Sequence, residues 1–112
     1  MSVRPKQYDI DGDVTTITYV PKIDGGSAEG YPTSGDARRE GLIRVRTKQT
    51  RWDERATLLH EIMHDCLMRA GIRTFATLKT EELFITLLEP YLLSVLRDNP
   101  ELRDYLFEEG AR

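Results

Sequence analysis

The second half of the chain carries the apolar periodicity of α-helices, and this pattern limits the possible folds more than any other feature. Between Arg51 and Ala70, apolar residues recur three or four positions apart, as they do along one face of a helix. Thr50, with Asp53 three residues later, resembles a capping box at the start of this segment, and Gly71 is a typical residue for its end. The sequence therefore predicts one long amphipathic helix here.

Two further helices are expected downstream. The second is expected to start near Thr77 or Thr80 and to continue past Pro90, which removes one backbone hydrogen bond and should kink it. A short third helix is expected to have Asn99 as its N-cap and to stop at Gly110. Together these segments predict a layer of two or three helices.

The first half of the chain has the patterns of strands and loops. Val14 to Val20 is rich in β-branched residues, and Leu42 to Lys48 alternates apolar with basic residues, as half-buried strands do. Between them, Pro21 to Gly41 contains five glycines and two prolines and predicts a flexible, glycine-rich loop. We expect an α+β fold in a single domain, residues 1–112, with a small antiparallel sheet packed on two to three helices.

Composition narrows the functional classes. A chain of 112 residues with 39% hydrophobic and 31% charged residues is typical of one globular domain, and no apolar run approaches the roughly 18 residues of a membrane span. A net charge of -3 argues against nucleic acid as a partner. The single cysteine, Cys66, and an N-terminus without a secretory signal predict a cytoplasmic location.

His60 and His64 are the only histidines of the chain, and Glu61 directly follows the first. Residues four apart on a helix share a face, so both imidazoles can reach one Zn²⁺ at about 2.0–2.1 Å. Glu61 would lie about 100° further round the helix, where it can take a proton from a zinc-bound water rather than bind the metal. This is the chemistry of the H-E-x-x-H motif, although two histidines on a helix are also commonly a packed or exposed pair.

A catalytic zinc site needs a third protein ligand, and no histidine remains to supply it. Glu81 and Glu82 lie at the start of the expected second helix. The spacing of Ile85 and Leu88 places Glu81 in the middle of the apolar stripe, where a carboxylate is costly unless it is paired or bound to metal. We therefore favour Glu81 as the third ligand and keep Glu82, at the edge of the stripe, as the alternative.

Three segments resemble the gluzincin metallopeptidases, in particular the minimal gluzincin-like proteins that bacteriophages and prophages often encode. They are "LLHEIMH" from Leu58, "EELFITLL" from Glu81 and "LRDNPELRDYL" from Leu96. The resemblance covers roughly the last two-thirds of the chain. It implies a zincin-like domain with the H-E-x-x-H motif on the first long helix, and the host cytoplasm as the location of a phage-encoded chain.

The resemblance also implies roles for individual residues. His60 and His64 correspond to metal ligands, Glu61 to the catalytic base, and either Glu81 or Glu82 to the third ligand. The strand Leu42 to Lys48 corresponds to the edge strand on which such enzymes lay an extended peptide. The substrate-binding residues would then be Ile43, Arg44 and Val45.

These observations predict a zinc-dependent metallopeptidase that cleaves a peptide or protein substrate, with Glu61 as the general base. The alternative is a non-catalytic zinc-binding protein or interaction module of the same fold, in which the metal braces a small core. A nucleic-acid-binding module that uses the basic residues Arg44, Arg46 and Lys48 is a third, less favoured hypothesis.

Overall fold

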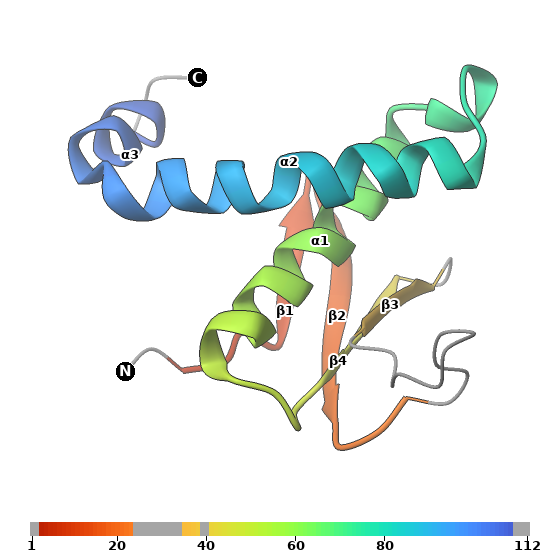
Figure 1. Ribbon diagram of the computed structural model, residues 1–112, viewed down its shortest axis with the longest axis horizontal. Coiled ribbons are helices and arrows are strands. Elements are labelled where there is room, and N and C mark those ends of the chain that lie inside the picture. The colour runs from red at the N-terminus through yellow and green to blue at the C-terminus, as the bar shows by residue number, and fades with distance from the viewer. Residues whose placement is uncertain (1–2, 24–34, 39–40, 109–112) are drawn as a thin grey trace.

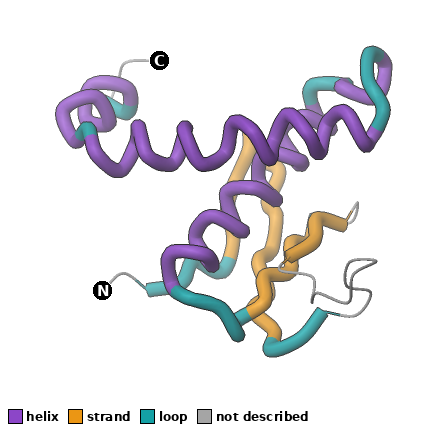
Figure 2. The backbone as a smooth tube through the Cα atoms, viewed as in Figure 1, coloured by secondary structure: helices purple, strands orange, loops and turns teal. Residues whose placement is uncertain are grey.

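A computed structural model describes residues 3–23, 35–38 and 41–108, and it has the α+β fold expected from the sequence (Figure 1). Within these residues the sheet has four strands, and three α-helices and one 3-10 turn follow it along the chain (Figure 2). The elements are β1 (Gln7–Ile10), β2 (Asp13–Val20), β3 (Gly35–Arg38), β4 (Leu42–Arg46), α1 (Arg51–Arg69), η1 (Ile72–Thr74), α2 (Leu78–Asp98) and α3 (Pro100–Leu106).

The sheet is mixed, with the strand order β1-β2-β4-β3, so the expectation of a purely antiparallel sheet is wrong. β1 and β2 form an antiparallel hairpin around Asp11 and Gly12, both of which have positive φ. β3 and β4 are also antiparallel, but β4 lies between β2 and β3 and runs parallel to β2. Apolar alternation predicts a strand and its faces, but it contains no information about the direction of the neighbouring strand.

β3 lies inside the segment Pro21–Gly41, which the sequence analysis expected to be a loop throughout. Residues 24–34 and 39–40 of that segment lie outside the described residues. β3 pairs with β4 from Gly35 to Arg38, on the side of β4 away from β2. The strand escaped prediction because its sequence, "GDAR", has neither β-branched residues nor apolar alternation.

β4 is an internal strand, so the prediction that it forms the edge of the sheet is wrong. Ile43 and Val45 are 1% and 0% exposed, and Arg44 is paired with the Asp36 carboxylate of β3. Ile43, Arg44 and Val45 therefore cannot offer a free strand edge to a peptide. Within the described residues the edge on this side of the sheet is β3.

The core is a thin apolar layer between the sheet and α1. Ile17, Ile43 and Val45 form the buried surface of the sheet, and Leu58 and Ile62 of α1 pack on it. Leu58 and Ile62 are one helical turn apart, so this contact fixes how α1 is rotated about its own axis.

Two charged groups of α1 tie it to the N-terminal part of the chain, one to Arg4 before β1 and one to Tyr8 within β1. The Glu54 carboxylate accepts hydrogen bonds from Arg4 Nε and Nη2 at 2.6 and 3.0 Å. Near the other end of α1, the Asp65 carboxylate accepts hydrogen bonds from Tyr8 Oη at 2.5 Å and from Arg69 Nε at 2.9 Å. Glu54 and Asp65 are both buried, so these bonds offset the cost of removing their charges from water.

Most of the predicted helix ends are confirmed. The side chains of Thr50 and Thr77 cap α1 and α2, and Gly71 follows α1 with a φ of 82°. α3 begins with Pro100 after Asn99 but ends at Leu106, before the predicted stop at Gly110, which lies outside the described residues.

α2 crosses α1 and extends well beyond it, with α3 turning away at its far end (Figure 1). Its principal contacts are with α1 and α3 rather than with the sheet. No helix among residues 3–23, 35–38 and 41–108 combines the length and the apolar character needed to cross a bilayer.

Replacing Ile43 with alanine tests the core. Because Ile43 is 1% exposed, Ile43→Ala should lower the free energy of unfolding by about 2–5 kcal/mol. Val14→Ala is the matched control in the same sheet, since Val14 is 46% exposed, and it should cost less than about 1 kcal/mol. Urea denaturation measures both values, and equal losses would contradict this description of the core.

The Arg4–Glu54 pair predicts a pH-dependent contribution to stability. The hydrogen bond from Arg4 holds the pKa of Glu54 below its ordinary value, so the stabilisation is present above that value and disappears as the pH falls through the lowered pKa. Arg4→Gln should therefore lower the melting temperature near neutral pH, and the difference from the parent should shrink as the pH falls below the ordinary pKa of a glutamate and through the lowered pKa of Glu54. Lys6→Gln, which removes an exposed charge two residues away, should show no such pattern.

Candidate metal centre

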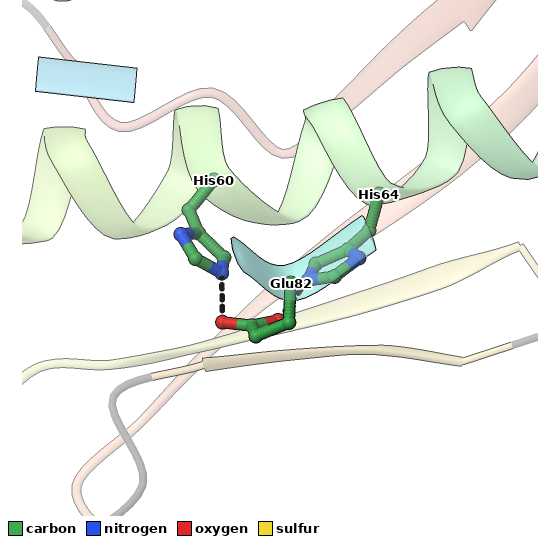
Figure 3. A group of neighbouring side chains, drawn as sticks. All are labelled: His60, His64 and Glu82. Carbon is green, nitrogen blue, oxygen red and sulfur yellow. Dashed lines mark hydrogen bonds and ion pairs between the residues drawn. The ribbon is translucent and has the colours of Figure 1, made fainter. Parts of the chain in front are cut away.

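His60 and His64 extend from the side of α1 that faces α2 (Figure 3). Because Leu58 and Ile62 lie on the sheet, each histidine, two residues further on, is turned about 200° away from it. The two ring centroids are 5.0 Å apart, with the ring planes inclined at 63°. Both side chains are partly exposed, so solvent reaches the imidazoles.

The Glu82 carboxylate lies between the two imidazoles. Its Oε1 is 2.9 Å from His60 Nε2, and its Oε2 is 2.5 Å from His64 Nε2 (Figure 3). One ligand atom from each of the three residues lies within 4.8 Å of the others. Two imidazole nitrogens and one carboxylate oxygen are a donor set that suits Zn²⁺ and leaves a fourth position open.

Glu81, the residue favoured from sequence as the third ligand, lies behind His64 instead. It is 1% exposed, as its place in the apolar stripe predicted, and its Oε2 is 2.9 Å from His64 Nδ1. Arg73 Nη2 donates to the same oxygen at 3.1 Å and supplies a positive charge. Glu81 can therefore hold the Nδ1–H tautomer of His64, which leaves Nε2 free for a metal. The geometry thus favours the alternative ligand, Glu82.

Glu61 lies on the flank of α1 next to β3 and is 7% exposed. Burial raises the pKa of its carboxyl group to about 7, against the opposing effect of the nearby His64, and the carboxylates of Glu82 and Asp36 raise it further. A carboxyl group with this pKa can both accept and donate a proton near neutral pH.

β3 approaches α1 closely at Gly35. A Cβ added there would lie 2.6 Å from Thr57 Cγ2, 2.9 Å from the Arg44 carbonyl oxygen and 3.3 Å from Glu61 Cγ. The first two distances are too short for a Cβ atom unless neighbouring atoms move. Glycine at this position therefore allows the edge strand to lie directly against the helix that carries the motif.

Two cavities meet at the centre, one of about 560 Å³ and one of about 880 Å³. Both are lined by Gly35, His60, Glu61 and Glu82. The smaller continues toward the start of α1, past Arg46, Gln49, Asp53, Ala56, Thr57 and Glu89. The larger continues toward the start of α2, past Asp36, His64, Met68, Arg73, Leu78, Lys79 and Glu81. The histidines and Glu61 thus lie in the middle of an open depression that has both polar and apolar walls.

Sequence reasoning identified the histidines and both carboxylates but missed two neighbours of the centre, Gly35 and Arg73. Gly35 was one of five glycines in the expected loop, and Arg73 belongs to the short turn η1. Neither position carries a local pattern that indicates a site. The predicted substrate contacts, Ile43, Arg44 and Val45, do not line either cavity.

Comparison of the chain with protein-family models, with curated protein sequences and with solved structures returned no match.

Substitution of the two adjacent carboxylates distinguishes ligand from supporting residue. Glu82→Ala removes a donor atom and should abolish measurable zinc binding, whereas Glu81→Gln keeps all three donors and should weaken binding about 10–100-fold. Isothermal titration of the metal-free proteins with Zn²⁺ measures both affinities. A greater loss in Glu81→Gln than in Glu82→Ala would assign the ligand to Glu81.

Proposed function

We propose that the chain is a zinc-dependent metallopeptidase that cleaves peptide or protein substrates. The observation that carries this proposal is the convergence of His60 Nε2, His64 Nε2 and the Glu82 carboxylate beside the buried Glu61, at the junction of two open cavities. α1 and α2 would thereby provide a metal-binding group, and α1 would also provide a general base, Glu61, beside it.

His60, His64 and Glu82 would hold the ion. A bound Zn²⁺ would polarise the scissile carbonyl group and lower the pKa of a coordinated water. Glu81 would orient His64 through Nδ1, and the hydrogen bond from Arg73 would hold the Glu81 carboxylate in place. Glu81 and Glu82 would have different roles because they contact different nitrogens of the His64 ring, Nδ1 and Nε2.

Glu61 would act as the general base and then as the general acid. It would accept a proton from the attacking water and later donate it to the leaving amine. Its burial supports this role because the desolvated carboxylate binds a proton more readily than an exposed one.

β3 is the element best placed to bind the substrate. Of the two edge strands of the described sheet, β3 is the one beside the centre, and Gly35 brings it against Glu61. An extended peptide that pairs with β3 would cross the centre, with side chains in the cavities on either side. β3 thus takes the role that the sequence analysis gave to Leu42–Lys48.

The proposed location is the cytoplasm, the host cytoplasm for a phage-encoded chain. The single cysteine supports this placement, since it allows no disulfide within the chain.

A non-catalytic zinc protein is the second candidate, and the position of Glu82 favours it. Glu82 contacts both histidines from the neighbouring helix, so a metal there would also join α1 to α2. The described chain has only five buried hydrophobic side chains, and small cores gain stability from such links. In that case zinc removal should lower the melting temperature, with no hydrolysis by the loaded protein.

Glu61→Gln is the decisive variant for the enzymatic proposal. It should retain the zinc content of the parent but lose hydrolysis of a peptide library by about 100-fold or more, because the proton carrier is gone. Glu101→Gln, on the exposed surface of α3, should behave as the parent. A parent protein that binds no zinc, or hydrolysis that persists unchanged in Glu61→Gln, would contradict the proposal.

A further inference from the structure

α2 carries an apolar stripe that nothing in the described chain covers. The stripe consists of Phe84, Leu87, Leu88, Tyr91 and Val95, which recur three or four residues apart on one side of the helix. Their exposed fractions are 64%, 61%, 51%, 73% and 43%. The stripe contains no charged residue, which is the composition of an interface rather than of a solvent-facing surface.

An apolar groove adjoins this stripe at the start of α2. It has a volume of about 400 Å³ and lies between α1 and α2, with Phe84 and Leu88 of the stripe on one wall. The remaining lining residues are Met63, Cys66, Leu67, Ile72, Glu81 and Ile85. Of these residues only Glu81 also lines a cavity of the metal centre, so the groove is a separate feature.

α3 presents a second set of exposed apolar side chains at the other end of α2. Leu102 is 39% exposed, Tyr105 75% and Leu106 53%, and Phe107 directly after the helix is 73% exposed. Among the described residues, these apolar side chains of α3 are left largely uncovered, and the groove has no occupant.

The exposed area is sufficient for a stable dimer. An aromatic side chain buries about 150–250 Å² when it is covered, so Phe84, Tyr91, Tyr105 and Phe107 alone could contribute roughly 400–700 Å². The leucines and Val95 add to this. A specific interface of standard size takes about 800 Å² from each partner.

We propose that the chain forms a homodimer in which the α2 stripes of two copies pack antiparallel and α3 of each copy covers the groove of the other. The midpoint of the stripe lies between Leu88 and Tyr91. A two-fold axis through this midpoint places the stripe of one copy against the stripe of the other. Pro100, the start of α3, lies about 16 Å from this midpoint along the helix axis, and Glu81, at the groove, lies about 13 Å away in the opposite direction. The two-fold axis therefore places α3 of one copy at the groove of its partner.

A second copy fits the surface better than an unrelated partner does. The stripe, the groove and α3 together form a self-complementary set, as a two-fold interface requires. The exposed apolar side chains also outnumber the fully buried ones, as expected for a core shared between two subunits. A second copy is present wherever the chain is made, so it can cover the stripe and the groove without another protein.

Sedimentation velocity of the parent and two variants tests the dimer. The parent should sediment as a dimer at micromolar concentration, Leu87→Glu should be monomeric, and Thr86→Glu should remain dimeric. Thr86 is exposed and adjacent on the same helix but lies outside the stripe, so it controls for the added charge. A monomeric parent, or a dimer that persists in Leu87→Glu, would overturn the proposal.

The single cysteine provides an independent test without any substitution. Cys66 is exposed in the isolated chain and lines the groove, so α3 of the partner would cover it in the dimer. Its alkylation by a maleimide should therefore slow on the order of tenfold as rising protein concentration drives dimer formation. A rate that does not change with concentration, in a protein shown to dimerise, would exclude α3 as the cover of the groove.

Discussion

The packing of Leu58 and Ile62 on the sheet is the contact on which the candidate centre depends. It fixes the rotation of α1, and helix geometry then determines where every other side chain of the motif points. His60 and His64 turn away from the sheet toward α2. Glu61 lies between these directions, close enough to β3 to be buried yet at the edge of the cavities. One apolar contact thus determines where both histidines and Glu61 point.

Two adjacent carboxylates on α2 serve different partners because successive residues on a helix point about 100° apart. Glu82 reaches the Nε2 atoms of both histidines, whereas Glu81 reaches Nδ1 of His64 from the buried side and is held by Arg73. A buried carboxylate without these partners would be costly. The cost of burying a carboxylate correctly indicated that Glu81 is paired. Glu81, however, contacts His64 from behind, and Glu82 is the carboxylate that lies between the two histidines.

The sequence predicted local features well and spatial relations poorly. Helix caps such as Thr50 and Thr77 involve residues close together in the sequence, and so does the pair His60 and His64. Such features can be predicted from sequence alone. The place of β4 in the sheet depends on strand pairing across a long segment, which its alternation does not encode. The choice between Glu81 and Glu82 depends on how α2 is rotated about its axis against α1. Apolar residues occupy more than half of the circumference of α2, so the sequence does not determine which side of the helix faces α1.

The breadth of that apolar surface has a thermodynamic consequence. α2 contacts the histidines with one side and carries its uncovered stripe on another, so its orientation affects both surfaces at once. A ligand that binds the histidines more tightly in the orientation of α2 required for association would strengthen association, and association would strengthen that ligand's binding by the same factor. Occupancy of the centre and subunit assembly would then be reciprocal effects, connected by the stiffness of a single helix.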